Sequence, residues 1–203
     1  MFKRILMIVI TASLVLALSA CTINMVTGSG KVIPQTRNVT GFTNVVFGGL
    51  GELVVLQGST EGLKIEAEDN IMARIKTEVK NGTLTIGFDR ENWQDLVNPT
   101  KPIKYTLSVK NLAALELTGA GNAVIETLKS TNLALKITGA GDIKIAKLEA
   151  ASVVTSLGGA GNIDLAGKVT KQEVTLSGLG NYSAGNLERA ACFPTGAASC
   201  RDG

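Results

Sequence analysis

Histidine is absent from this sequence of 203 residues. Its imidazole is the commonest general base and proton shuttle in enzymes and a frequent metal ligand. A serine nucleophile activated by a histidine base is therefore excluded. No spacing of cysteines or carboxylates that is typical of a metal site is visible either. We expect no catalytic residue, no metal site and no cofactor.

Charge is also scarce. Charged residues make up 18% of the chain, and the formal net charge is only +3. The basic residues are mixed with acidic ones, whereas nucleic-acid binding usually shows as a basic patch or stripe. We therefore expect no nucleic-acid partner.

Long apolar runs are absent after the N-terminus. There, Lys3 and Arg4 precede an apolar run from Ile5 to Leu18. This layout predicts a secretory signal peptide over residues 1–20. The run is shorter than the roughly 20 residues that a membrane-spanning helix needs, so we expect no transmembrane segment.

The signal ends in Leu18-Ser19-Ala20-Cys21, which resembles a bacterial lipoprotein box. The resemblance implies cleavage before Cys21, lipidation of Cys21 and attachment to the membrane, because two or more acyl chains hold a protein stably. The alternative is an ordinary signal peptide with a chance cysteine. Residues 21–27 would form a short tether, and Thr22 favours the outer membrane of the cell envelope, on its periplasmic or surface face.

Two further cysteines, Cys192 and Cys200, lie near the C-terminus. In an oxidising compartment they could form a disulfide across a short loop. Equally, both thiols could be incidental.

A glycine motif repeats with a period of about twenty residues. An isolated earlier copy is Gly49-Leu50-Gly51-Glu52. The four regular copies are Gly119-Ala120-Gly121-Asn122, Gly139-Ala140-Gly141-Asp142, Gly159-Ala160-Gly161-Asn162 and Gly178-Leu179-Gly180-Asn181. We interpret these glycines as structural corners, where a tight bend or a positive φ costs glycine nothing. A dinucleotide-binding loop would need a helix after the motif, and a calcium-binding repeat would need a period of nine.

The residues around each corner repeat in register. Two positions before the first glycine stand Phe47, Leu117, Ile137, Leu157 and Leu176, and two positions after the second stand Leu53, Ala123, Ile143, Ile163 and Tyr182. Alternation with polar residues predicts half-buried strands. The sequence therefore predicts an all-β solenoid of roughly 20-residue coils, in which like residues stack and Asn122, Asp142, Asn162 and Asn181 form one column.

The first half is less regular but rich in β patterns. Residues 63–67 and 75–79 alternate, and Asn81-Gly82 predicts a hairpin turn. We expect Asp69 to cap one helical turn, a loop from Asp89 to Lys101 that contains Trp93, and a strand from Ile103 to Val109.

These stretches resemble the head GIN domain family, labelled auto-transporter adhesins and of unknown function. The similarity lies in Gly28-Ser29-Gly30-Lys31-Val32, residues 37–42, the hairpin at residues 81–86, the corners and residues 178–185. It implies a right-handed parallel β-helix-like solenoid, as a single domain over residues 28–190. Residues 191–203 depart from the family and form an atypical tail, for which a cap, disorder and truncation remain open.

Three functions follow as hypotheses. The first is a non-catalytic, lipid-anchored envelope module, structural or adhesive, that binds protein or polysaccharide through a rigid β surface. The second is a carbohydrate-active enzyme using Asp89, Glu91 or Asp95. The third is a periplasmic binder of a small ligand or lipid, with the Trp93 loop over a pocket. We interpret Glu66, Glu68 and Asp69 as a solvated turn, and the oligomeric state stays open.

Overall fold

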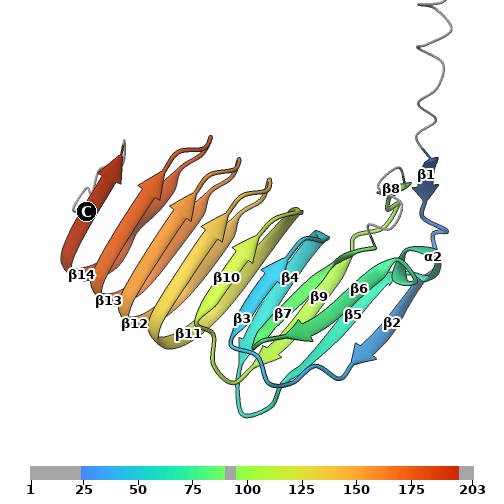
Figure 1. The fold of residues 1–203 in the computed structure, drawn as a ribbon, viewed down its shortest axis with the longest axis horizontal. Helices are drawn as coiled ribbons and strands as arrows, with labels where there is room; N and C mark the ends of the chain where they lie inside the picture. The colour runs from blue at the N-terminus through green and yellow to red at the C-terminus, as the bar shows by residue number, and fades with distance from the viewer. Residues whose placement is uncertain (1–23, 90–94, 197–203) are drawn as a thin grey trace, which may run out of the picture.

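The computed structural model describes residues 24–89 and 95–196. Within these residues the strands form one twelve-stranded sheet and one two-stranded sheet (Figure 1). The N-terminal elements are β1 (Asn24–Thr27), β2 (Val32–Arg37), β3 (Asn44–Phe47), β4 (Leu50–Gln57), β5 (Gly62–Glu68), the short helix α2 (Asp69–Met72), β6 (Ile75–Lys80), β7 (Thr83–Phe88), β8 (Asp95–Asn98) and β9 (Lys104–Val109). The C-terminal elements are β10 (Ala114–Leu117), β11 (Ala120–Ile137), β12 (Ile143–Leu157), β13 (Ile163–Leu176) and β14 (Tyr182–Gly196).

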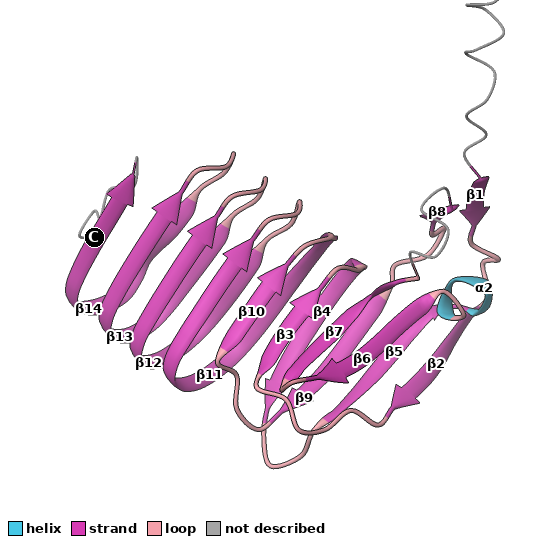
Figure 2. Ribbon diagram, viewed as in Figure 1, coloured by secondary structure: helices cyan, strands magenta, loops and turns pink. Residues whose placement is uncertain are grey.

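The prediction of a right-handed parallel β-helix-like solenoid is wrong. The large sheet is mixed: β5 pairs antiparallel with both β2 and β9, and β6 pairs antiparallel with β7. The sheet curls into a half-barrel (Figure 2). The physical reason is that the chain reverses direction in the N-terminal half, where β5 runs against β2 and β9 and a tight hairpin joins β6 to β7, whereas the regular glycine motif begins only at Gly119.

The C-terminal strands are parallel and keep a spacing of nineteen to twenty residues. Leu117 is in register with Ile137, Ile137 with Leu157, and Leu157 with Leu176. A second row, Leu53, Ala123, Ile143, Ile163 and Tyr182, lies in register in the same way. The long strands β11 to β14 bend near their middles, so that each contributes two arms to the curled sheet (Figure 2).

The core fills the inside of the curl with aliphatic side chains from both halves. Phe47 and Tyr105 meet edge to face, with ring centroids 5.0 Å apart, a favoured aromatic geometry. Burial raises the pKa of Tyr105. Its hydroxyl has no hydrogen-bond partner among the described residues.

The hairpin predicted at Asn81-Gly82 is confirmed. Asn81 has φ 51° and Gly82 has φ 73°, and the turn joins the antiparallel strands β6 and β7. Positive φ at both central residues fits the right-handed twist of the flanking strands. The predicted strand up to Val109 is present as β9, with Tyr105 and Leu107 buried.

Three local predictions need correction. Asp69 is the first residue of α2, and the N-cap is Glu68. The expected loop from Asp89 to Lys101 contains β8, and the expected tether of residues 21–27 contains β1, which pairs with β8. Trp93 lies outside the described residues. No helix in the described part of the chain has the length and apolar character needed to cross a membrane.

Candidate functional site

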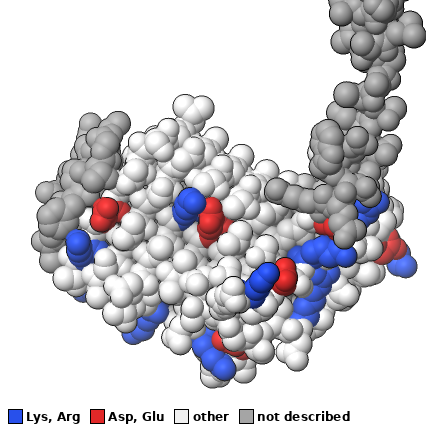
Figure 3. Space-filling view, viewed as in Figure 1, with Lys and Arg blue, Asp and Glu red and all other residues white. Residues whose placement is uncertain are grey.

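One outer face of the large sheet carries few charges. We call it the front face: the outward side chains of β3, β10 and the C-terminal arms of β11 to β13. One of its rows is Val46, Glu116, Lys136, Ser156 and Thr175, each in register with the next. In Figure 3 the surface toward the viewer is largely white over β10 to β13, whereas several blue side chains lie together over the β5 and β6 side. The front face is therefore a nearly neutral surface bearing small and hydroxyl side chains.

An ion pair lies within this row. The Lys136 ammonium is 3.0 Å from the Glu116 carboxylate, and the Thr138 hydroxyl lies 3.3 Å from the same carboxylate oxygen. Glu116 and Lys136 lie directly opposite each other on the neighbouring strands β10 and β11. The ion pair cancels two charges without removing either from solvent.

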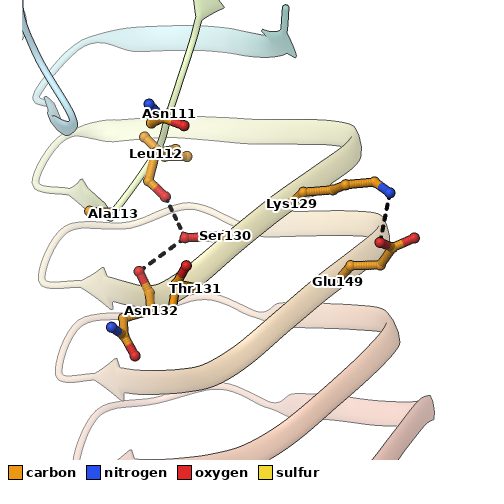
Figure 4. A pocket seen from close by; sticks show the side chains of 8 residues that line it. All are labelled: Asn111, Leu112, Ala113, Lys129, Ser130, Thr131, Asn132 and Glu149. Atoms are coloured by element: carbon orange, nitrogen blue, oxygen red, sulfur yellow. Dashed lines mark hydrogen bonds and ion pairs between the residues drawn. The ribbon is translucent and has the colours of Figure 1, made fainter.

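A shallow pocket of 510 Å³ lies at one end of the front face, where β10 begins and β11 bends (Figure 4). Lys129 and Glu149 form an ion pair at 2.8 Å on its rim. The Ser130 hydroxyl donates a hydrogen bond to the Leu112 carbonyl oxygen at 2.9 Å and so joins β11 to the β9–β10 connection at the base of the pocket. Asn132 is two residues from Ala134 on the same strand, so the pocket continues into the front face.

Three polar groups in this pocket are unpaired. The side chains of Asn111, Thr131 and Asn132 make no hydrogen bond to any other described residue, and all three residues are exposed. Together they offer amide donors, amide oxygens and a hydroxyl to a ligand. These groups therefore suit a polar, neutral ligand.

The predicted glycine corners bring neighbouring backbones into close approach. A Cβ built on Gly139 would overlap the carbonyl oxygen of Gly119, and one on Gly159 would overlap that of Gly139. The same holds for Gly119 against Gly49, Gly141 against Gly121, Gly161 against Gly141, Gly178 against Gly159, and Gly180 against Gly161, while a Cβ on Gly121 would meet the Phe47 ring. Of these, Gly161 and Gly180 have positive φ. Space between strands, more than positive φ, is what requires glycine here.

The column of Asn122, Asp142, Asn162 and Asn181 forms a hydrogen-bonded ladder. The Oδ1 atom of each of the first three accepts the backbone N–H of the next, at 2.9, 2.7 and 3.2 Å. Asn162 and Asn181 also donate their side-chain amides to the preceding Oδ1. Each of these three Oδ1 atoms thus accepts a hydrogen bond from the protein itself.

The acidic residues weighed as catalytic groups do not form a cluster in the described chain. Asp89 pairs with Lys76 at 3.2 Å, and Glu66 pairs with Lys64 at 2.6 Å. Glu91 and the side chain of Asp95 lie outside what the structure describes. No group of three or more histidine, cysteine or acidic side chains suited to a metal occurs among the described residues.

The interpretation of Glu68 as part of a solvated turn is wrong, because Glu68 is only 1% exposed. Its carboxylate accepts hydrogen bonds from the Gly30 N–H at 2.6 Å and from the Thr100 N–H and hydroxyl at 2.8 and 2.5 Å. The Thr100 hydroxyl is the main cause that lowers the pKa of Glu68. A Cβ on Gly28 would overlap this carboxylate. The Gly28-Ser29-Gly30 segment therefore owes its glycines partly to Glu68.

The cysteines are only partly visible. Cys21 and Cys200 lie outside the described residues. The backbone of Cys192 is in β14, in register with Gln172, but its side chain is not described. The lipidation of Cys21 and a disulfide between Cys192 and Cys200 stay predictions.

The fold and its surfaces define an all-β domain with a curled mixed sheet and in-register outer rows. Residues 41–193 match the family described as "Putative auto-transporter adhesin, head GIN domain". The chain belongs to this family, and the resemblance inferred from the sequence is confirmed. No curated protein matches the chain.

Solved structures share the fold. A crystal structure of a "putative adhesin" from Bacteroides fragilis has 28% identity and a TM-score of 0.78, over 83% of this chain and 78% of that one. A "putative lipid binding protein" from Parabacteroides distasonis has 18% identity and a TM-score of 0.68, over 84% and 80%. A "putative adhesin" from Parabacteroides merdae has 16% identity and a TM-score of 0.63, over 84% and 80%. The family links the chain to the cell envelope and to adhesion.

Sequence reasoning missed the pocket and the buried Glu68. The pocket joins residues of the β9–β10 connection to the bend of β11, and no repeat or motif marks that meeting. For Glu68, the signal available was the pair of glycines at residues 28 and 30, which lies about forty residues away.

Proposed function

We propose that this chain is a non-catalytic, lipid-anchored adhesion module of the bacterial cell envelope that binds an extended polysaccharide along its front face. The observation that supports it best is the continuity between the hydroxyl-bearing rows of the front face and the pocket with unpaired Asn111, Thr131 and Asn132. The family and the predicted lipid on Cys21 agree with this role.

The register of the strands gives the front face a repeat that suits a polymer. Neighbouring strands in a sheet lie about 4.8 Å apart, so the hydroxyls of Ser156 and Thr175 recur at that spacing. A polysaccharide presents hydroxyls at regular intervals and can bind such a row through several weak hydrogen bonds. Protein interfaces are instead enriched at their centres in aromatic residues, methionine and arginine, which the front-face row lacks.

The other two hypotheses have less support. A hydrolase needs two carboxylates facing one bond, whereas Asp89 is held by Lys76. The structural neighbour named as a lipid binder is 18% identical, which relates the two by fold alone. The pocket at β10 and β11 is open and lined mostly by polar side chains, which does not suit an acyl chain.

The test is the binding of the purified lipoprotein to cell-wall and matrix polysaccharides, measured by calorimetry. We expect the double variant Thr131→Ala/Asn132→Ala and the front-face variant Thr175→Glu to bind at least roughly tenfold more weakly, because each loses or blocks a hydrogen-bonding group. Thr106→Glu is the matched control, because Thr106 is a half-buried outward residue on β9.

Equal binding by all four proteins would refute the front face as the site. Binding to an envelope protein and to no polysaccharide would replace the glycan by a protein partner. Release of new reducing ends from any polysaccharide would refute the non-catalytic role.

The anchor is tested separately. Replacing Cys21 with alanine should move the protein from the membrane fraction to the soluble fraction, and protease shaving of intact cells should then report whether the domain faces outward. An unchanged membrane fraction would refute lipidation as the anchor.

A further inference from the structure

The two short strands β1 and β8 form a parallel ribbon beside the large sheet (Figure 1). Met25 and Leu96 are in register on this ribbon and are 60% and 51% exposed. The other large exposed hydrophobic side chains of the described residues are Val32, Leu56, Val154 and Leu179, which lie on separate elements. Single exposed hydrophobic residues are ordinary, but an in-register pair on a solvent-facing ribbon needs an explanation.

The ribbon has one definite orientation on the domain. Successive side chains of a strand point to opposite faces, so Val26 and Val97 point away from Met25 and Leu96. Both valines are partly buried and pack against the hydrophobic core. Met25 and Leu96 are therefore held on the outer side of the ribbon.

Hydrogen bonds close the C-terminal end of the ribbon and join it to α2. The Gly28 N–H donates to the Asn98 carbonyl at 3.0 Å, and the Asn70 side chain donates to the Thr27 carbonyl at 2.8 Å. The buried Glu68 carboxylate, at the end of β5, accepts hydrogen bonds from the N–H and the hydroxyl of Thr100, which follows β8 in the chain. Instead of a loose tether, the chain enters the domain through a strand that pairs with β8 and is hydrogen-bonded to α2 at its C-terminal end.

The distance from the anchor limits where this pair can lie. Cys21 and Asn24, the first residue of β1, are three residues apart, which is about 10 Å of fully extended chain. We propose that Met25 and Leu96 insert into the headgroup region of the bilayer that holds the Cys21 lipid and so fix the domain in one orientation on the membrane. The inference rests on the proposed lipid anchor. Apolar side chains at such a surface add to the attachment that the acyl chains supply.

The test uses the full lipoprotein in phosphatidylethanolamine and phosphatidylglycerol vesicles, with Leu96→Trp in a Trp93→Phe background that removes the one native tryptophan. Phospholipids brominated near the top of the acyl chain quench only tryptophans close to them. We expect roughly twofold lower fluorescence for Leu96→Trp in brominated vesicles, because interfacial side chains sit near the headgroup and acyl boundary. Val154→Trp in the same background is the control, because Val154 is 44% exposed on β12, and it should show no quenching.

The outcomes separate the two proposals. Lipidated protein that floats with the vesicles but shows no quenching of Leu96→Trp overturns the membrane contact and leaves the anchor intact. Quenching of Val154→Trp to the same extent also overturns it, because the domain then has no fixed orientation. Mass spectrometry that finds no lipid on Cys21, with no flotation, overturns both. A Met25→Asp variant in the Leu96→Trp protein should relieve the quenching, and Leu56→Asp should not.

Discussion

The two halves of this domain hold their strands in register by different means. From β10 onward, residues nineteen to twenty apart lie side by side, and the same backbone contact recurs at each glycine corner. In the N-terminal half, single side chains such as Glu68 and Asn70 join segments that are 32 to 43 residues apart. Repetition thus distributes the stabilisation over many equivalent positions, whereas the irregular half concentrates it in a few residues.

The largest effect should come from filling a glycine corner. In Gly139→Ala the new Cβ overlaps the backbone oxygen of Gly119, and backbone cannot move away as a flexible side chain can. We expect a loss of about 4 kcal/mol or more in the free energy of unfolding, at the severe end for single substitutions. Urea unfolding followed by circular dichroism measures it.

Gly62→Ala is the matched control for this substitution. A Cβ at Gly62 meets nothing within 4 Å, and its φ is not positive. We expect a change within about 0.5 kcal/mol. Equal losses at Gly62 and Gly139 would show that close approach of the backbones is not what selects glycine at the corners.

The stability of the irregular, N-terminal half should depend on pH through one residue, Glu68. Hydrogen bonds, the Thr100 hydroxyl first, lower the pKa of Glu68 from an ordinary value of 4.5. The stabilisation from Glu68 is therefore complete above pH 4.5 and is lost as the pH falls through the lower pKa of the folded state. Glu68→Gln should have a lower Tm at pH 7 and a shallower fall of Tm in acid than the unmodified chain.

Glu78→Gln serves as the control for that measurement, because Glu78 is an exposed residue of β6. Its Tm should follow that of the unmodified chain from neutral pH into acid. An acid profile of Glu68→Gln that matches the unmodified chain would contradict the role given to Glu68.

A smaller effect is expected in the hydrogen-bonded ladder of Asn122, Asp142, Asn162 and Asn181. Asn162→Ala removes the oxygen that accepts both the backbone N–H and the side-chain amide of Asn181. We expect a loss of about 1 kcal/mol, typical of one net hydrogen bond, in urea unfolding. Asp142→Asn keeps its Oδ1 acceptor and should cost less. The reverse order would mean that the charge of Asp142 matters more than the ladder.

The contrast between the halves also explains what the sequence could predict. The positions of Leu117, Ile137 and Leu157 repeat with a fixed spacing, so their register follows from the sequence alone. The Asn81-Gly82 turn is similarly local, because its two residues determine the hairpin. Extending the repeat to the whole domain failed, because the antiparallel pairing of β5 with β2 and β9 has no counterpart in the spacing.

The candidate site was harder to predict for the same reason. Asn111 and Asn132 come from different parts of the chain and meet only because β10 lies beside β11. Glu68 stands in an acidic run typical of solvent-exposed turns, and its burial depends on the Thr100 hydroxyl and on Gly30. No local sequence pattern marks the pocket or the contacts of Glu68, so neither could be predicted from the sequence alone.

The smallest effect should be that of the ion pair on the front face. Glu116 and Lys136 pair across strands, with side chains 29% and 51% exposed, whereas Lys64 and Glu66 pair along one strand of the irregular half, with side chains 53% and 40% exposed. A double-mutant cycle of Glu116→Gln and Lys136→Met should give a coupling of about 0.5 kcal/mol, and the same cycle at Lys64 and Glu66 should give less, because exposed pairs are screened by solvent. Both couplings should decrease at high salt. A larger coupling for the Lys64 pair would contradict the expectation that an ion pair across in-register strands is the stronger of the two.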